Sequence, residues 1–127
     1  MRIGVRRERA PEERRVALVP DELAGLLEAG HGLVVEPGAG LRAGFGDDEY
    51  VTAGAVIGDL EGCAVVACVR RPGREDATPL VAGTLVVGLL DPLGDAGGIG
   101  ELAGRGVTGV AMELVPRITR ADRKSVV

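Results

Sequence analysis

Arginine side chains gather directly after three apolar segments of the chain, each of which has the pattern of a β-strand. Nine of the 15 basic residues lie in these positions: Arg6, Arg7, Arg9, Arg14, Arg15, Arg70, Arg71, Arg117 and Arg120. Because ligands of parallel sheets bind beyond the carboxyl ends of the strands, these guanidinium groups would share the functional edge of such a sheet. A guanidinium stays charged and pairs bidentately with carboxylate or phosphate. The pattern therefore predicts an anion-binding edge.

The same arginines have acidic neighbours in the sequence. These are Glu8, Glu12, Glu13, Glu75 and Asp76. Each arginine can instead belong to a solvated rim of ion pairs, which contributes little to stability or function. For any single arginine we favour the ion-pair interpretation, whereas the size of the cluster favours an anion site.

Few other residues are candidates for chemistry. Cys63 and Cys68 lie in the apolar run CAVVACV, which is typical of buried structural thiols. His31 follows a predicted helix end and is interpreted as part of its cap. Asp91 precedes a proline after an apolar run, a position that suits either function or a simple turn. Because a single histidine cannot supply a metal cluster, we predict no metal site.

The stretch EPGAGLRAGF contains Gly38, Gly40 and Gly44 after a predicted strand, which invites a dinucleotide-binding interpretation. That fingerprint needs its third glycine three residues after the second, at the opening of a helix. The residue at that position is Ala43. We therefore interpret the stretch as a loop and find no dinucleotide-binding turn in the chain.

The apolar runs and their boundaries predict an alternation of strands and helices. Strands are expected at residues 2–6, 32–36, 63–69, 84–90 and 107–115. Helices are expected at 21–31 and 47–54, and weaker ones at 74–83 and 94–106. Such alternation is typical of βαβ units with right-handed crossovers. The predicted fold class is α/β, a flavodoxin-like or Rossmann-like doubly wound parallel sheet of about five strands in one domain.

Composition and charge exclude several classes of function. The chain has 127 residues, of which 46% are hydrophobic and 27% charged, as expected for one folded domain. A net charge of -4 and only one Phe and one Tyr argue against a nucleic-acid partner. No apolar run approaches the roughly 18 residues of a membrane span, and the N-terminus is charged where a signal peptide is apolar. We therefore expect a soluble protein of the cytoplasm.

Four segments carry a family resemblance. MRIGVRRERAPEERRVALVPDELAGLLEAGH, VEPGAGLRAGFGDDEYVTAGA, GLLDPL and AMELVPRITRA together resemble the N-terminal domain shared by alanine dehydrogenase and the alpha subunit of proton-translocating NAD(P) transhydrogenase. The resemblance covers residues 1–121 and implies an incomplete domain there, because the family continues into a Rossmann domain. Residues 122–127, DRKSVV, depart from the family's Gln-Ser-Met-Asp, and we expect them to be a non-native tail.

The resemblance implies different residues in the two branches of this family. Alanine dehydrogenases hold pyruvate with an arginine that matches Arg15, a lysine that falls at Arg70 and a histidine that falls at Asp91. Arginine is a poor proton donor, and aspartate cannot replace an imidazole that titrates near neutral pH. Arg15 and Arg70 remain candidates for binding an anion or substrate.

The ending ELVPRITRA resembles the transhydrogenase branch, in which this segment belongs to a loop over the nicotinamide. The resemblance thus implies that Arg117, Ile118, Thr119 and Arg120 bind the cofactor and that Arg117 is the catalytic contact. The implied activity is hydride transfer between NAD(H) on this subunit and NADP(H) on a partner domain. A membrane domain couples that transfer to proton movement.

The resemblance also implies the surroundings of the protein. The expected partners are the transhydrogenase beta subunit, the membrane domain and a second copy of the chain in a homodimer. The complex would lie at the cytoplasmic face of the inner membrane, and the isolated chain would be inactive. Two alternatives remain, an NAD-dependent alanine dehydrogenase fragment and a non-catalytic module that binds a small anion or a partner's acidic surface.

Overall fold

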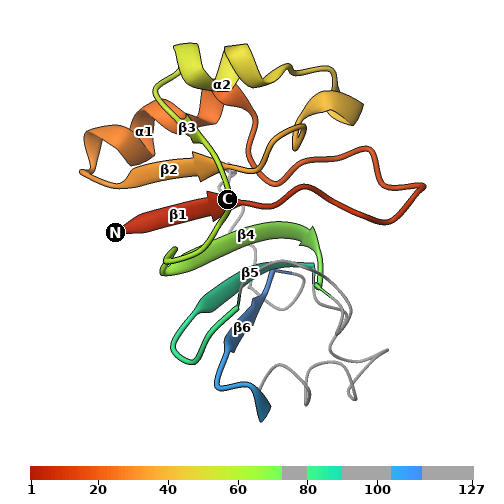
Figure 1. Cartoon of the computed structure of the whole chain (residues 1–127), viewed down its shortest axis with the longest axis vertical. Coiled ribbons are helices and arrows are strands. Elements are labelled where there is room, and N and C mark those ends of the chain that lie inside the picture. The colour runs from red at the N-terminus through yellow and green to blue at the C-terminus, as the bar shows by residue number, and fades with distance from the viewer. Residues whose placement is uncertain (73–79, 90–103, 113–127) are drawn as a thin grey trace, which may run out of the picture.

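Six parallel strands form one sheet within residues 1–72, 80–89 and 104–112, which the computed structural model describes (Figure 1). The strands are β1 Arg2–Val5, β2 Gly32–Val35, β3 Val56–Ile57, β4 Val65–Arg70, β5 Leu85–Leu89 and β6 Thr108–Ala111. Their order across the sheet is β3-β2-β1-β4-β5-β6. Each neighbouring pair is parallel, with Val5 opposite both Val35 of β2 and Ala67 of β4.

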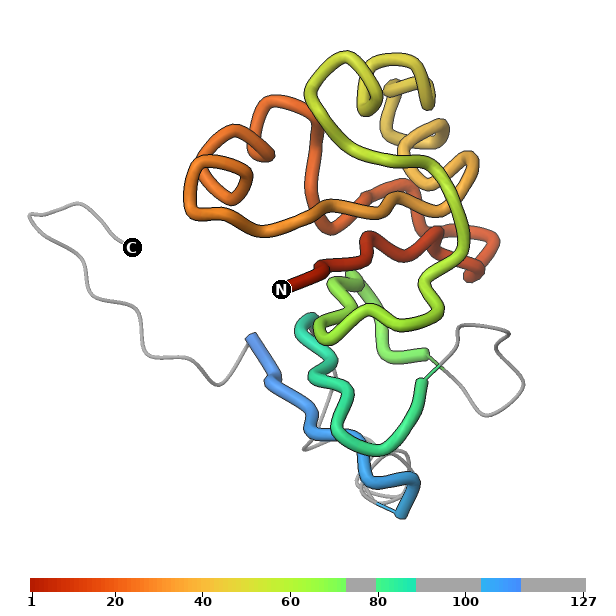
Figure 2. The backbone as a smooth tube through the Cα atoms, turned by 60° about the vertical axis from the view of Figure 1, so that its left-hand side comes forward, coloured from red at the N-terminus to blue at the C-terminus, as the bar shows by residue number. Residues whose placement is uncertain are grey.

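Two short helices lie beside the first three strands. They are α1 Leu23–Glu28, preceded by the 3₁₀ turn η1 Pro20–Glu22, and α2 Asp47–Thr52, preceded by the 3₁₀ turn η2 Leu41–Ala43. Figures 1 and 2 show both helices on the same side of the molecule, next to β2 and β3. This is the arrangement that two successive right-handed crossovers, β1 to β2 and β2 to β3, produce.

The helix ends follow from local sequence. The Glu49 carboxylate accepts a hydrogen bond of 2.9 Å from the Gly46 N–H and so satisfies a free donor at the start of α2. After α1, Gly30 adopts a φ of 92°, and the backbone N–H of His31 donates to the Leu26 carbonyl at 3.1 Å. The helix therefore ends at Glu28 rather than at the predicted residue 31, and His31 lies in the cap that follows it, as predicted.

The hydrophobic core divides by the alternation of side chains along the strands. One cluster joins Val5, Val35, Leu23 of α1 and Tyr50 of α2. Val34, whose side chain points to the opposite face of β2, belongs to a second cluster with Leu60, Cys63 and Val66. A third cluster contains Cys68, Val86 and Val107. Burial on both faces explains why the strands are apolar throughout.

The structure confirms the α/β fold with a parallel sheet. The five predicted strands correspond to β1, β2, β4, β5 and β6, and their order is the flavodoxin-like 2-1-3-4-5. The sequence interpretation missed β3, because two residues give no periodicity. Its addition at the edge produces the Rossmann order 3-2-1-4-5-6.

One helix prediction needs correction. The weak helix predicted over 74–83 is wrong at residues 80–83, which contain a turn. Gly83 adopts a φ of 92° there, and the Thr84 N–H donates to the Val81 carbonyl at 3.0 Å. Residues 73–79 lie outside the described part of the chain, as do 94–103 of the weak helix predicted at 94–106.

Candidate functional site

The carboxyl ends of β1 and β4 lie side by side at the centre of the sheet. From β1 the chain crosses to β2 on one side, whereas β4 leads to β5 on the other. Ligands of doubly wound sheets bind at such a switch point. The loop after β1, residues 6–19, supplies most of the predicted arginine edge, and the end of β4 supplies Arg70. The fold therefore brings these two segments together, as predicted.

Glu13 joins the two predicted anion-binding residues. Its side chain is 3% exposed. Arg15 donates to it bidentately, from Nε to Oε2 at 2.8 Å and from Nη2 to Oε1 at 2.9 Å. Arg70 donates from Nε to the same Oε1 at 2.8 Å. The structure thus brings Arg15 and Arg70 together on one buried carboxylate.

These hydrogen bonds control the charge of Glu13. The bonds from Arg15 are the largest influence and hold the pKa of the Glu13 carboxyl well below its usual range, against burial, which acts in the opposite direction. The bond to Glu13 also raises the pKa of Arg15 and of Arg70. All three groups are therefore ionised at neutral pH.

A second carboxylate, Glu8, fastens the loop to the end of β4. Glu8 is buried, with 3% of its side chain exposed, and pairs with the equally buried Arg6 at 3.0 Å. Its oxygens also accept the backbone N–H groups of Val69 at 2.8 Å and Arg70 at 3.0 Å. The side chain thereby continues the hydrogen bonding between β1 and β4 beyond the strand, next to an irregularity in the register of β4 and β5.

A third carboxylate, Glu36 at the end of β2, holds the loop from the other side. Arg9 donates to Glu36 bidentately, at 3.1 and 3.0 Å. The backbone N–H of Arg7 donates to the same carboxylate at 2.7 Å. Sequence analysis missed Glu36 because it is distant from Arg9 along the chain.

The ion-pair interpretation is thus confirmed for Arg6, Arg15 and Arg70, whose partners include the predicted Glu8, Glu12 and Glu13. Arg9 also forms an ion pair, although with a residue that we did not predict. Arg7 and Arg14 have no side-chain hydrogen bond or ion pair within the part of the chain that the structure describes.

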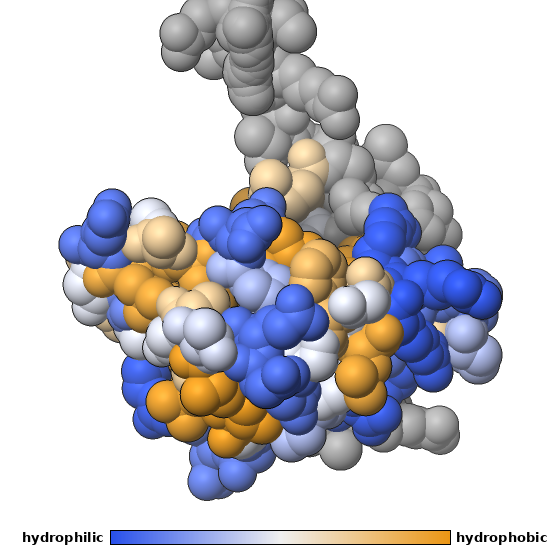
Figure 3. Space-filling model, turned by 90° about the horizontal axis from the view of Figure 1, so that it is seen from above, coloured by the Kyte–Doolittle hydropathy of each residue, from blue (hydrophilic) through white to orange (hydrophobic). Residues whose placement is uncertain are grey.

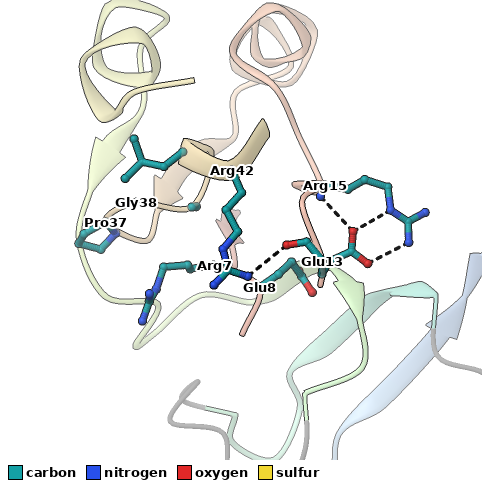
Figure 4. A pocket seen from close by; sticks show the side chains of 9 residues that line it. Arg7, Glu8, Glu13, Arg15, Pro37, Gly38 and Arg42 are labelled. Carbon is teal, nitrogen blue, oxygen red and sulfur yellow. Dashed lines mark hydrogen bonds and ion pairs between the residues drawn. The ribbon is translucent and has the colours of Figure 1, made fainter. Parts of the chain in front are cut away.

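A cavity of about 280 Å³ opens beside this network, between the loops that follow β1 and β2 (Figure 4). It is lined by Arg7, Glu8, Glu13, Arg15, Pro37, Gly38, Ala39, Leu41 and Arg42. Sequence analysis missed Arg42, since it lies in the glycine-rich loop rather than at a strand end. Arg42 Nη1 donates to the carbonyl oxygens of Ala10 at 2.8 Å and Glu13 at 3.2 Å.

A larger cavity, of about 440 Å³, lies on the other side of Arg15. Its lining is mainly apolar and comes from the loop after β1, from β4 and β5, and from Met112 after β6. Arg15 therefore stands between a charged cavity and an apolar one. Its side chain is 61% exposed, so solvent reaches the guanidinium.

The remaining predicted residues lie away from this network or outside the described residues. The His31 Nδ1 is 3.3 Å from the N-terminal amine. Both lie at the amino ends of the strands, whereas Arg15 lies in the loop after the carboxyl end of β1. Cys63 and Cys68 are buried as free thiols. Within residues 1–72, 80–89 and 104–112 no group of His, Cys, Asp and Glu could hold a metal ion. Asp91, Arg117, Ile118, Thr119 and Arg120 lie outside those ranges.

The surface over α1, α2 and β3 mixes hydrophobic and hydrophilic side chains (Figure 3). Val51 of α2 and Val56 of β3 are 54% and 64% exposed. Among the described residues, none of the helices has the length and apolar character that crossing a membrane requires.

The fold and the site together define a doubly wound α/β domain with a charged network at its topological switch point. The family described as "Alanine dehydrogenase/PNT, N-terminal domain" matches residues 4–127. The chain belongs to this family. The resemblance inferred from the sequence motifs is therefore confirmed.

Individual relatives lie in both branches of the family. NAD(P) transhydrogenase subunit alpha of Cereibacter sphaeroides is 38% identical over 97% of this chain, which spans 24% of that protein. The crystal structure of transhydrogenase from Sinorhizobium meliloti superposes with a TM-score of 0.89 and 39% identity, covering 95% of this chain and 37% of that one. Alanine dehydrogenase of Bacillus subtilis is 34% identical over 91% of this chain and 32% of its own length. The chain thus spans about a quarter to a third of its relatives.

Proposed function

We propose that this chain is the N-terminal part of an NAD(P) transhydrogenase alpha subunit, an oxidoreductase that transfers hydride between NAD(H) and NADP(H). The observation that carries the proposal is the 38% identity to such a subunit over 97% of the chain. The residues at two positions support this branch over alanine dehydrogenase. By the family resemblance, Arg70 and Asp91 fall at the positions where an alanine dehydrogenase has the lysine and histidine of its pyruvate site.

The reaction itself belongs to the cofactor, because the nicotinamide ring supplies or accepts the hydride. The protein contributes position and the exclusion of water. In this proposal Arg117 contacts the nicotinamide end of NAD(H), while Ile118, Thr119 and Arg120 complete the loop around it. NADP(H) is held by a partner domain rather than by this chain.

The domain in this proposal extends over residues 1–121, followed in the complete subunit by a Rossmann domain with its glycine-rich turn. The beta subunit, a membrane domain that moves protons and a second alpha subunit are the proposed partners, at the cytoplasmic face of the inner membrane. The isolated chain binds NAD(H) weakly and is inactive.

Arg15 and Arg70 take a structural role in this proposal. Both donate to Glu13, and Arg70 also donates to Glu12 at 3.2 Å. The two arginines therefore hold the loop after β1 against the end of β4. In an alanine dehydrogenase, the alternative function, the same pair would need to bind the carboxylate of pyruvate.

The decisive experiment uses the full-length protein encoded at the source locus, assembled with its partner subunits. Reduction of an NADP analogue by NADH is expected, without NAD reduction by alanine. Arg117→Ala should lower kcat and weaken the binding of NADH, and Arg2→Ala, at the amino end of β1, is the matched control. NAD reduction that depends on alanine would overturn the proposal in favour of the alternative.

A further inference from the structure

The 280 Å³ cavity between the loops after β1 and β2 carries positive charge that the protein does not neutralise. Three arginines line it, Arg7, Arg15 and Arg42 (Figure 4), and of these Arg15 is paired with Glu13. Pro37, Gly38 and Leu41 also belong to the lining. Its volume is just below the roughly 300–1,000 Å³ of sites for drug-sized molecules. The cavity is therefore large enough for a small molecule that is no larger than a typical drug.

Arg42 is fixed in place by one of its three nitrogen atoms. Nη1 donates to the carbonyl oxygens of Ala10, Pro11 and Glu13, at 2.8, 3.5 and 3.2 Å. Nε and Nη2 have no acceptor among the residues that the structure describes. A guanidinium held in this way keeps an unused pair of donors in a geometry that matches an oxyanion.

Arg7 is fixed at its backbone and its stem. Its N–H donates to Glu36 at 2.7 Å. Its Cδ lies only 3.7 Å from the position that a Cβ on Gly38 would take, so the stem runs along the glycine. Its guanidinium has neither a carboxylate partner nor another acceptor within residues 1–72, 80–89 and 104–112.

The two carboxylates that line the cavity are occupied by other donors. Glu8 accepts from Arg6 and from the backbone N–H groups of Val69 and Arg70. Glu13 accepts from Arg15 and Arg70. Neither carboxylate accepts a hydrogen bond from Arg7 or from the Arg42 side chain, whose bond to Glu13 goes to the backbone carbonyl. Two positive charges thus face the cavity without a protein counter-ion in the described structure.

We propose that this cavity binds a phosphate group, either as free phosphate or as a small phosphate monoester. A phosphate dianion offers two negative charges to Arg7 and Arg42, and its tetrahedral oxygens accept several donors at once. The cavity is lined by the loops after β1 and β2, whereas the residues proposed for the nicotinamide lie at 117–120. The inference rests on residues 7–42 alone and does not depend on the role proposed for residues 117–120.

Isothermal titration of the complete 127-residue chain with inorganic phosphate, at low and constant ionic strength, tests this site. Binding is expected for the unaltered chain. Arg7→Gln should weaken it by about 10-fold to 100-fold, the loss expected when a charge-assisted hydrogen bond is removed. Arg7 is the first choice because its side chain forms no hydrogen bond or ion pair with the described residues, whereas Arg42→Gln also releases the loop at residues 10–13.

The matched control is Arg2→Gln, which removes the same charge from the far end of β1 and should leave phosphate binding unchanged. Circular dichroism of each variant shows whether it is folded. An alkyl phosphate that binds tighter than inorganic phosphate would assign the site to monoesters, and the reverse would assign it to the free ion. The proposal is overturned if the unaltered chain does not bind phosphate at millimolar concentration, or if Arg7→Gln and Arg2→Gln bind it equally.

Discussion

Arg15 and Arg70 donate to the same oxygen atom, Oε1 of Glu13, at 2.9 and 2.8 Å. The two arginines come from different segments, and their meeting depends on the pairing of β1 with β4. Each keeps one terminal nitrogen, Nη1 of Arg15 and Nη2 of Arg70, without an acceptor among the described residues. The network is therefore a structural bridge that still presents donors to an anion.

Replacement of Glu13 by Gln should make stability less dependent on acid pH. The pKa of Glu13 is lowered by Arg15 and Arg70, so the ionised carboxylate contributes stability above its ordinary value of 4.5 and loses it as pH falls further. We expect Glu13→Gln to cost about 1–3 kcal/mol at neutral pH. The difference from the unaltered chain should shrink below pH 4.5, as measured by urea unfolding across a pH series.

Glu12→Gln is the control for this pH dependence. Glu12 also pairs with Arg70, but the two side chains are 66% and 48% exposed. An exposed pair of this kind contributes about 1 kcal/mol or less. A Glu13→Gln variant whose deficit stays constant into acid would show that its effect is one of packing rather than charge.

Replacement of Glu8 by Gln should destabilise the fold more than the loss of any of the exposed ion pairs. The change removes the charge of the Glu8 carboxylate, which pairs with the buried Arg6 guanidinium, and it weakens the acceptors of the Val69 and Arg70 N–H groups. Breaking a buried pair in this way costs about 3–5 kcal/mol. Urea unfolding should show a lower midpoint with an unchanged slope. A loss below about 1 kcal/mol would mean that water reaches this pair.

The fold could be predicted from the sequence because each long strand is a continuous apolar run, as burial on both faces of the sheet requires. The gathering of arginines at one edge could also be predicted, because parallel strands place their carboxyl ends together. The sequence could not locate Glu36 or Arg42, since both act through contacts between distant loops. It also could not distinguish Glu8, which caps backbone N–H groups, from Glu12, which lies exposed.

Gly40 should be intolerant of a side chain, although its φ is an ordinary -96°. A Cβ at this position would lie 2.7 Å from Cε2 and 2.8 Å from the hydroxyl oxygen of Tyr50. Because Tyr50 is fully buried, it cannot move aside. We expect Gly40→Ala to cost about 1–3 kcal/mol, as overpacking does.

The matched substitution is Gly25→Ala within α1, where a Cβ would meet no atom within 4 Å. Alanine favours the helix by about 0.8–1.0 kcal/mol over glycine, so this variant should be more stable. Thermal unfolding of both variants provides the comparison. Gly40→Phe enlarges the clash, so this variant should be less stable than Gly40→Ala. A Gly40→Phe variant as stable as Gly40→Ala would contradict the predicted clash with Tyr50.

Tyr50 should report the integrity of the loop after β1, because its hydroxyl donates to the Leu18 carbonyl at 2.8 Å. Burial, followed by the nearby Glu22, Asp47 and Glu49, raises the pKa of Tyr50 to about 12. As the only tyrosine in a chain without tryptophan, it can be titrated by ultraviolet absorbance. In the folded protein the Tyr50 hydroxyl should ionise at a pH well above its ordinary pKa of 10.0.

The same raised pKa makes stability fall in alkali. The contribution of Tyr50 is complete below pH 10.0 and is lost as pH rises towards about 12, because the unfolded chain releases the phenolic proton first. Tyr50→Phe should cost about 0.5–1.5 kcal/mol at neutral pH, the value of one hydrogen bond, and should lack this alkaline loss. A titration midpoint near 10 in the folded chain would instead show that the Tyr50 hydroxyl is in contact with water and that the loop is not closed over it.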